Sequence, residues 1–269
     1  MGVLNLTPDS FSDGGRYLRN AAAGAAAIDA DAALHAARRM VDEGASIIDV
    51  GGESTRPGAQ PVPVQQELDR VIPVIKKIAA ELDCVISLDS SSPQVMQEAA
   101  TAGVGLLNDV RSFRREGALQ AAVASGLPLC IMHMRGEPGT MQQQPEYRDV
   151  VTEVVDFLAL RLQQLCAAGV GREQVILDPG FGFGKRLQHN LQLLAKLQAV
   201  SALQCPVLVG MSRKSMIGEV LSKPVDQRLH GGLALAAIAV MHGASIVRTH
   251  DVAATVDAIA MAQAVRDAQ

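Results

Sequence analysis

Short apolar runs rich in β-branched residues alternate along the chain with longer segments whose apolar residues recur every three or four positions. The first kind of run indicates a strand and the second an amphipathic helix. The strand-like runs lack a regular apolar–polar alternation, as expected of parallel strands buried on both faces. Eight runs are predicted to be strands: Val3–Asn5, Ser46–Val50, Val85–Asp89, Leu106–Asp109, Leu129–His133, Val175–Asp178, Val207–Gly210 and Ser245–Thr249.

Helix signals fall between these runs. The patterns include Val64–Glu81, Pro93–Ala102, Val150–Ala168 and Leu229–His242. Ser92 before Pro93 is typical of an N-cap followed by proline at the first helical position. Glycines stand just past several helix ends, where a left-handed residue is often needed. They are Gly44, Gly103, Gly126, Gly169 and Gly243.

This succession of strand–helix units predicts an α/β fold with a parallel sheet. Closing the sheet gives a (β/α)8 TIM barrel, which easily reaches about 250 residues as one domain. An open doubly wound sheet is the alternative. The chain has 269 residues, 48% of them hydrophobic, and no linker is evident, so a single domain spanning residues 1–269 is expected. The Ala-rich stretch Arg19–Ala33 is expected to be an extended first helix or a mobile loop before it.

Composition narrows the function classes. A formal net charge of -4 gives no basic surface bias toward nucleic acid. No apolar run approaches the roughly 20 residues of a membrane helix. The four cysteines are far apart and form no Cys-x-x-Cys pair, so reduced, mostly buried thiols in a cytoplasmic protein are expected.

Polar residues end most of the predicted strands. In a barrel these ends converge on one face, where active sites are built. One such residue can be a turn former or a helix cap, but so many in one chain favour a site. Loops Gly51–Pro63 and Met134–Pro145 exceed the usual length of about 2–6 residues, which is typical of lids and binding loops. The strand-end residues are Asn5, Asp49, Asp89, Asn108, Asp109, His133, Asp178, and Arg248 to His250.

Two kinds of chemistry are indicated at these ends. The segments Ser212–Ser215 and Arg248–His250 follow the seventh and eighth strands, the usual anion site of a barrel, although a surface cluster near a helix start is the alternative. Asp89, Asn108 and Asp178 offer paired acceptors and an amide, which suit a flat 2-amino-4-oxo heterocycle. A metal centre held by two acids is the rival interpretation, but no His-x-x-Glu spacing accompanies them.

The glycine-rich segment Asp178–Lys185 is not a phosphate-binding loop. The spacing from Gly180 to Gly184 is one residue too short for that motif, and Arg186 replaces its Ser or Thr. We expect this loop to pack flat against a planar ligand, with Phe183 as a wall.

These motifs resemble those of dihydropteroate synthases over nearly the whole chain. Enzymes of this family join (7,8-dihydropterin-6-yl)methyl diphosphate to 4-aminobenzoate, giving diphosphate and 7,8-dihydropteroate, a folate precursor. The resemblance therefore implies a transferase of folate biosynthesis. The matching segments are Asn5–Gly15, Asp49–Gly58, Asn108-Asp109, Asp178–Lys185, and Gly210–Ser215 with Arg248 and His250.

The resemblance also implies residue roles. The pterin would be held by Asp89, Asn108, Asp178 and Lys214. The diphosphate would face Asn5, Thr55, Arg56, Arg248, Thr249 and His250. The aminobenzoate would be surrounded by Phe11, Pro57, Phe183 and Ser212. The residues expected to take part in catalysis are Asp89, Lys214, Arg248 and His250.

Mg2+ is the implied cofactor, with Asn5 as its protein ligand. This ion prefers oxygen ligands, keeps waters and leans on substrate phosphates. We expect a dissociative reaction in which diphosphate leaves first, the pterin ring delocalises the positive charge, and the aryl amine then attacks. Mg2+, Arg248 and His250 would stabilise the leaving charge, and no protein nucleophile is needed.

Further expectations concern partners and motion. The resemblance implies competition by sulfonamides and a homodimer formed through later helices such as Leu229–His242. Loops at approximately 6–20 and 51–63 are expected to be mobile, with Phe11 closing over the aminobenzoate after the diphosphate binds. One departure stands out. The family's Asp-Thr-Ser-Lys-Pro is Asp89-Ser90-Ser91-Ser92-Pro93 here, which removes a cation near the mouth of the site.

Two alternative functions remain open from sequence. A pterin-binding methyltransferase on the same barrel would share the acidic pocket but would not need the Asn5–Gly15 loop or the Ser212–Ser215 cations. A non-catalytic pterin-binding paralogue would keep Asn108 and Asp178 but lose the loops and the metal ligand. Fold alone does not separate these functions.

Overall fold

The structure is a computed structural model that describes residues 1–7, 28–54, 61–136, 139–143 and 145–268. The strands are β1 Gly2–Asn5, β2 Ile47–Gly51, β3 Val85–Asp89, β4 Leu106–Asp109, β5 Leu129–Met132, β6 Val175–Asp178, β7 Leu208–Val209 and β8 Ile246–Val247. The helices are α1 Ala30–Asp42, α2 Val64–Glu81, α3 Pro93–Ala102, α4 Ala118–Ser125, α5 Val150–Ala167, α6 Leu187–Ala195, α7 Gln198–Ser201, α8 Ser215–Leu221, α9 Leu229–Met241 and α10 Val252–Asp267.

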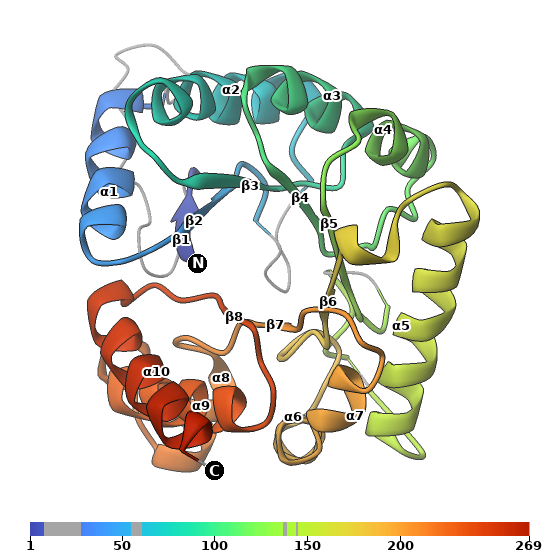
Figure 1. Ribbon diagram of the computed structural model, residues 1–269, viewed down its shortest axis with the longest axis vertical. Helices are drawn as coiled ribbons and strands as arrows, with labels where there is room; N and C mark the ends of the chain where they lie inside the picture. The colour runs from blue at the N-terminus through green and yellow to red at the C-terminus, as the bar shows by residue number, and fades with distance from the viewer. Residues whose placement is uncertain (8–27, 55–60, 137–138, 144, 269) are drawn as a thin grey trace.

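The strands close into a parallel barrel. Strands β1 to β6 pair in chain order, and β7 pairs with β8. Single parallel bridges, Leu177 with Val207 and Gly2 with Thr249, join these two groups into a ring. Figure 1 shows the strands inside and the helices around them. The predicted barrel is therefore confirmed, and the open doubly wound alternative is excluded.

Local sequence signals predicted many of the helix and strand boundaries correctly. Strands β3, β4 and β6 and helices α2 and α3 have the predicted bounds. The glycines predicted to end helices all have positive φ, from 65° at Gly126 to 109° at Gly103. Strands β7 and β8 are shorter than predicted, because each has only a single bridge, not a ladder, on its other side. Ser92 occupies the N-cap position, but its hydroxyl contacts Gln94 instead of capping the helix.

Helix α1 does not extend over the Ala-rich stretch. Asp29 caps the helix, since its Oδ1 accepts the N–H groups of Asp31 and Ala32, both at 3.1 Å. An N-cap fixes where a helix begins. Of the described residues in that stretch, Ala30–Ala33 are helical, and its residues up to 27 lie outside the described part of the chain.

Alternation along the strands separates two apolar layers. One set of strand residues packs against the surrounding helices in the main core. Residues on the opposite face point into the barrel, because successive side chains of a strand point to opposite sides. This interior cluster contains Leu106, Cys130 and Leu208, with Met1, Ile176 and Ile246 packed against them. These apolar side chains fill the barrel interior below the carboxyl ends of the strands, and we call them the apolar plug.

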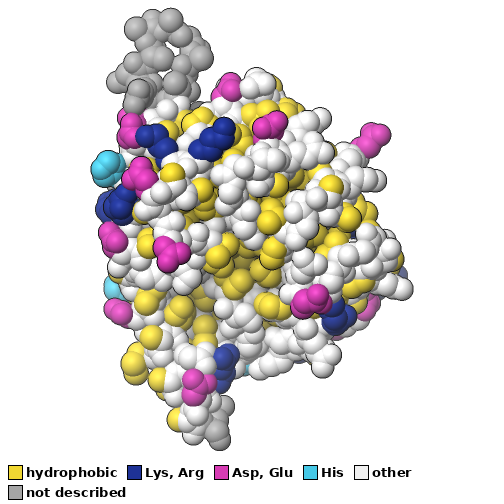
Figure 2. Space-filling model, turned by 45° about the horizontal axis from the view of Figure 1, so that its top comes forward, with side chains coloured by type: hydrophobic (Ala, Val, Ile, Leu, Met, Phe, Trp, Pro, Cys, Tyr) yellow, Lys and Arg dark blue, Asp and Glu magenta, His cyan; other side chains and the backbone are white. Residues whose placement is uncertain are grey.

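The surface and the thiols fit the compositional expectations in part. Figure 2 shows charged side chains of both signs scattered over the face in view, with hydrophobic side chains between them. All four cysteines are free, with Cys130 and Cys205 buried, Cys84 half-buried and Cys166 exposed, so the thiols are less uniformly buried than predicted. Among the described residues, no helix is long and apolar enough to cross a membrane.

A left-handed turn follows β4 and is fixed by a buried arginine. Ser112 and Phe113 have φ of 56° and 57°, a conformation that costs non-glycine residues energy. Arg161 of α5 donates from Nε to the Ser112 carbonyl at 2.6 Å and from a terminal nitrogen to the Phe113 carbonyl at 2.8 Å. Asp109 accepts the Phe113 N–H at 2.6 Å. Strand β4 is therefore anchored to α5 just beyond Asn108 and Asp109.

We expect Arg161→Leu to lower the free energy of unfolding by about 2–4 kcal/mol, because two buried carbonyl groups lose charge-assisted hydrogen bonds. Urea denaturation would measure the change. The matched control is Arg38→Leu, which removes a surface ion pair whose side chains are both 45% exposed. This control should cost about 1 kcal/mol or less. Equal losses in the two variants would contradict the anchoring role of Arg161.

Candidate active site at the carboxyl ends of the strands

Polar residues replace the apolar plug at the upper end of the barrel interior. On single strands the change is direct: Leu106 is followed two positions later by Asn108, and Ile176 by Asp178. In register, Asn5 lies beside Gly51, Gly51 beside Asp89, and Asp89 beside Asn108. Residues in register share a level in a parallel sheet, so these side chains face one space above the plug.

Arg248 connects the acids of this layer. Its Nε contacts Asp49 Oδ2 at 2.6 Å, and a terminal nitrogen contacts Asp89 Oδ2 at 3.3 Å. Asp49 is fully buried and also accepts a hydrogen bond from Ser87 Oγ at 2.6 Å. Asn108 donates to the same carboxylate at 3.4 Å. The sequence placed Asp49 among the polar strand-end residues, but no substrate-binding or catalytic role was predicted for it.

One guanidinium therefore faces two buried carboxylates. Burial raises the pKa of Asp89 to about 8, the Asp49 charge adds to this effect, and Arg248 opposes it. A carboxyl group in this state is stabilised by any ligand that brings N–H donors or positive charge. The geometry thus favours a ligand with a donor-rich or electron-poor edge beside Asp89.

A third acid, Asp178, lies on β6. Asp178 Oδ1 accepts the Gly180 N–H at 2.7 Å. Burial raises the pKa of Asp178, and the nearby Lys214 ammonium opposes that rise. Lys214 donates to the Phe181 carbonyl, and its nitrogen lies 4.6 Å from the centre of the Phe183 ring. Burial lowers the pKa of Lys214 to about 8, so the lysine remains mostly charged at neutral pH. Asp178, Lys214 and Phe183 provide a charged edge beside a flat aromatic wall.

The segments after β7 and β8 meet at the same end. Ser212 Oγ lies 3.1 Å from His250 Nδ1 and accepts the His250 N–H at 3.3 Å. Burial and the charges of Arg248 and Arg213 lower the pKa of His250 to about 3. His250 is therefore a neutral hydrogen-bonding group here, not a cation. Arg213 is paired with Asp251.

Thr249 is oriented differently from its neighbours. Its amide and carbonyl pair with Met1 and Val3 across the seam of the barrel. Its hydroxyl contacts Thr255 at 2.9 Å, and the residue is buried. In this structure Thr249 joins β8 to β1 and places Arg248 and His250 on either side.

A metal ligand is available at the end of β1. The Asn5 side chain makes no hydrogen bond to another described residue, so its amide oxygen has no competing partner there. A Cβ placed on Gly51 would lie 3.8 Å from Asn5 Oδ1 and 3.5 Å from Asp89 Cβ, so the absent side chain leaves space between them. In the described residues, no group of three His, Cys, Asp or Glu side chains could enclose a metal. A single amide ligand suits Mg2+, which relies on waters and substrate phosphates.

The structure brings together all but one of the predicted site residues that it describes. These are Asn5, Asp89, Asn108, Asp178, Phe183, Ser212, Lys214, Arg248 and His250. The exception is Thr249, whose hydroxyl contacts Thr255 instead. Four predicted residues fall outside the described part of the chain, as do residues 8–20 of the first loop expected to move and residues 55–60 of the second. The four residues are Phe11, Thr55, Arg56 and Pro57.

A buried cluster supports the base of the loop after β2. Arg70 of α2 donates to the Gly52 carbonyl at 2.8 Å, and Arg111 lies 3.7 Å from Glu53. Glu67 of α2 is 2% exposed, and its Oε1 is the one buried side-chain oxygen without a hydrogen-bond partner in the described structure. Burial raises the pKa of Glu67 despite a hydrogen bond from Ser90.

Comparisons with known proteins agree with this geometry. A family model described as a pterin binding enzyme matches residues 1–250. The dihydropteroate synthase of Haemophilus influenzae is 51% identical over 268 residues, covering 100% of this chain and 94% of that protein. The Yersinia pestis dihydropteroate synthase in complex with a sulfonamide drug has a TM-score of 0.93 and 49% identity, covering 99% of this chain and 94% of that one. The Xanthomonas albilineans dihydropteroate synthase with 4-aminobenzoic acid has a TM-score of 0.89 and 44% identity, covering 99% and 92%.

We expect Glu67→Gln to change how stability depends on pH. The raised pKa means that the folded protein holds the Glu67 proton more tightly than the unfolded chain does. The wild type therefore loses stability as pH rises from the ordinary glutamate pKa of 4.5 to the higher folded pKa, whereas the Gln variant has no such proton. Chemical denaturation across this range should show the variant gaining on the wild type as pH rises. A constant difference would count against a buried, protonated Glu67.

Proposed function

The chain belongs to the family of pterin-binding enzymes, and on that premise we propose that it is a dihydropteroate synthase. It condenses (7,8-dihydropterin-6-yl)methyl diphosphate with 4-aminobenzoate, forming 7,8-dihydropteroate and diphosphate. As a transferase it joins two small molecules in folate biosynthesis. The observation that carries the proposal is the polar layer above the barrel plug, where Arg248 joins Asp49 to Asp89 and Lys214 lies near Asp178.

The acids of this layer suit the pterin. A 2-amino-4-oxo ring presents N–H donors beside a carbonyl acceptor, and carboxylates bind such paired donors well. Asp178 and Asn108 offer acceptors and an amide donor, and Lys214 donates to a ring nitrogen or oxygen. Phe183 provides the flat wall that a planar ring needs. Asp89, whose pKa burial raises to about 8, faces the electron-poor part of the pterin.

The diphosphate and aminobenzoate occupy the mouth of the site. Arg248, neutral His250 and the Arg56 and Thr55 of the loop after β2 face the diphosphate. Ser212 and the start of α8 face the aminobenzoate carboxylate, with Phe11, Pro57 and Phe183 around its ring. The positions of Phe11, Thr55, Arg56 and Pro57 come from the family resemblance alone.

The reaction proceeds by departure of the diphosphate before the amine attacks. Breaking the bond between the exocyclic carbon and oxygen leaves positive charge on the pterin, which the ring nitrogens share. Asp49, Asp89 and Asp178 stabilise this charge, while Arg248 and His250 hold the diphosphate through hydrogen bonds. The neutral aryl amine then forms the carbon–nitrogen bond and releases a proton. Cys130 is the cysteine nearest to this layer, since it pairs in register with Asn108, but it lies in the apolar interior cluster and burial raises the pKa of its thiol, so it is not an activated nucleophile.

Mg2+ is the proposed cofactor, and Asn5 would hold it beside the diphosphate. When bound, the ion supplies positive charge to the departing diphosphate. The unengaged Asn5 amide and the space over Gly51 support this assignment. Sulfonamides are proposed to compete for the aminobenzoate site, as the ligands of the Yersinia and Xanthomonas enzymes suggest. A cytoplasmic location, where folate precursors and reduced thiols occur, completes the proposal.

An assay with purified protein, Mg2+, the pterin diphosphate and 4-aminobenzoate tests the function. We expect dihydropteroate and diphosphate in equal amounts. Asp89→Ala should lower kcat/KM by at least about a hundredfold, because the cationic pterin loses a carboxylate in a desolvated site. Asn5→Ala should weaken the apparent Mg2+ affinity and lower kcat.

Arg38→Leu, on the surface of α1, serves as the control and should retain wild-type turnover. Absence of both products with the wild type would favour a pterin-binding protein without catalysis. Unchanged turnover of Asn5→Ala and Asp89→Ala at saturating Mg2+ would refute the residue assignment.

The apolar surface of the last helices supports a homodimer. Five of the large hydrophobic side chains that remain exposed in the described structure lie on α8, α9 or α10: Val220, Leu221, Ile238, Met261 and Val265. Contiguous exposed apolar patches mark interaction surfaces. Helix α9, which contains most of the predicted Leu229–His242 segment, has no Asp, Glu, Lys or Arg. We propose a second copy of the chain as the occupant.

We expect Ile238→Glu and Met261→Glu to convert the dimer to monomers, because each places a charge in a buried apolar contact. Light scattering after size-exclusion chromatography would measure the mass. Leu160→Glu is the matched control, since Leu160 is 57% exposed on α5, away from the proposed interface. A wild-type monomer, or an equal effect of Leu160→Glu, would rule out this interface.

A further inference from the structure

The loop Gly180–Gly184 has neither helix nor strand, yet every carbonyl group in it accepts a side-chain hydrogen bond. Lys185 Nζ bonds Gly180 at 2.8 Å and Phe183 at 3.2 Å. The remaining bonds are Lys214 to Phe181, Gln142 to Gly182, and Tyr147 to Gly184 at 2.7 Å. Buried backbone groups need such partners when no ladder supplies them. The shape of this loop is therefore set by side chains outside it.

Close packing explains why this loop needs glycine. Gly180 and Gly184 have φ of 70° and 60°, in the left-handed region. A Cβ on Gly180 would lie 1.9 Å from the His133 carbonyl oxygen, and one on Gly184 would lie 2.6 Å from that of Arg135. The loop is thus pressed against the segment that follows β5, and its Gly180 and Phe183 carbonyl groups face Lys185.

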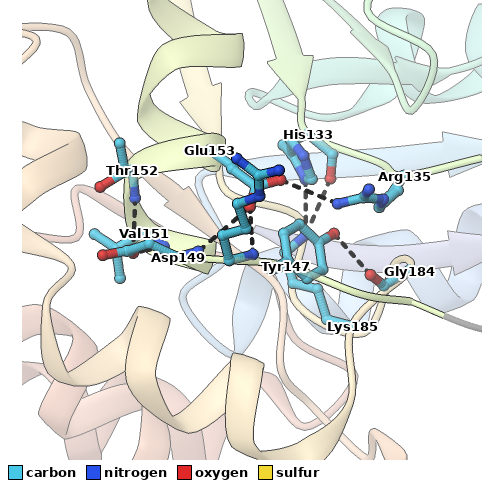
Figure 3. A network of polar contacts seen from close by, with 10 residues as sticks. His133, Arg135, Tyr147, Asp149, Val151, Thr152, Glu153, Gly184 and Lys185 are labelled. Carbon is cyan, nitrogen blue, oxygen red and sulfur yellow. Dashed lines mark hydrogen bonds and ion pairs between the residues drawn. The ribbon is translucent and has the colours of Figure 1, made fainter.

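Lys185 fills the centre of this arrangement. It is 3% exposed, and its ammonium also lies 2.9 Å from His133 Nδ1 and 3.3 Å from the His133 carbonyl. Burial lowers the pKa of His133 to about 2, so this imidazole is neutral and its Nδ1 accepts a hydrogen bond from the lysine ammonium. Figure 3 shows Lys185 beneath His133, with Tyr147 reaching Gly184 and the separate Arg135–Glu153 ion pair at the surface.

The same loop forms part of the pterin pocket. Its first N–H binds Asp178, its Phe181 carbonyl holds Lys214, and its Phe183 ring lies under the Lys214 nitrogen. Charge links the groups as well, because Lys185 and Lys214 both favour the ionised form of Asp178. Burying a charge costs free energy unless hydrogen bonds or an opposite charge compensate it. The ammonium of Lys185 bonds the Gly180 and Phe183 carbonyls, which belong to the loop that borders this pocket.

We infer that Lys185 is a positioning residue for the pterin pocket, whose buried ammonium holds the Gly180 and Phe183 carbonyls and so presents the loop and Asp178 to the pterin. This inference rests on the proposed function. Lys185 itself does not face the ligand; it acts through Asp178, Phe183 and Lys214. The titratable or charged groups around it are Asp178 on β6, His133 and Arg135 after β5, Tyr147 before α5, Arg186 and His189 at the start of α6, and Lys214 before α8.

Pterin affinity of three variants tests this inference, measured by isothermal titration with 6-hydroxymethylpterin, which lacks the diphosphate. At about pH 6, Lys185→Met should bind about tenfold more weakly than the wild type, as expected when charge-assisted hydrogen bonds are lost. Lys185→Arg, which keeps a charge, should recover part of the affinity. Tyr147→Phe removes the bond to Gly184 without removing charge. It should lower the melting temperature and weaken pterin binding by less than Lys185→Met does, with a ratio to the wild-type Kd that does not change between about pH 6 and about pH 9.

The pH dependence of pterin binding distinguishes a role of the Lys185 charge from a role of its side chain in packing alone. Burial lowers the pKa of Lys185 to about 7, so the wild type loses this charge as pH rises above that value. The ratio of the Met variant's Kd to the wild-type Kd should therefore shrink toward one between about pH 6 and about pH 9. Lys214 titrates in both proteins, so its effect cancels in the ratio. If Lys185→Met does not fold, the wild-type Kd relative to that of Lys185→Arg should rise over the same range.

Each outcome decides the question. Equal pterin affinity of the wild type and Lys185→Met, with only a lower melting temperature, would show a purely structural lysine and overturn the inference. A ratio that stays constant with pH would exclude the ammonium as the positioning group. A wild-type protein that binds no pterin would instead overturn the proposed function, which the variants do not test.

Discussion

The guanidinium of Arg248, held between the carboxylates of Asp49 and Asp89, is the interaction on which the upper end of the barrel depends. It joins β8 to β2 and β3, which are 199 and 159 residues away along the chain. Removing one member of a buried ion network leaves the others uncompensated, which costs more than an exposed pair contributes. The contact that orders these strands also sets the charge of the candidate site.

Charge is distributed unevenly across this layer, and the chemistry follows from that distribution. Near Asp89, one guanidinium serves two carboxylates, so the pKa of Asp89 rises with burial and the region accepts N–H donors or developing positive charge. Near Asp178, the ammonium groups of Lys185 and Lys214 both favour the ionised form of a single carboxylate. A pterin that becomes cationic when its diphosphate leaves fits between these regions. The neutral state of His250 adds hydrogen bonding at the mouth without more positive charge.

Buried side chains from neighbouring elements fix the segments that border this space. Arg161 holds the turn after β4, Arg70 holds Gly52 at the start of the loop after β2, and Lys185 holds the loop after β6. Each donates to backbone carbonyl groups that no helix or strand could satisfy. Rigid support of this kind lets irregular segments present functional groups in a fixed geometry. The barrel thus sets where these segments begin, and the buried arginine and lysine donors fix their backbone geometry.

The barrel fold and most residues of the candidate site could be predicted from local sequence patterns. Apolar periodicity gave the bounds of β3, β4 and β6, glycines marked the helix ends, and motifs at strand ends identified Asp89, Asn108, Asp178 and Lys214. Such features are local, because a strand end or a helix cap is written in a few adjacent residues. Other features became evident only in the three-dimensional structure. They are the shortness of β7 and β8, the pairing of Arg248 with Asp49, the neutral state of His250 and the burial of Lys185. These depend on distance and desolvation between residues remote in sequence, which no local pattern encodes.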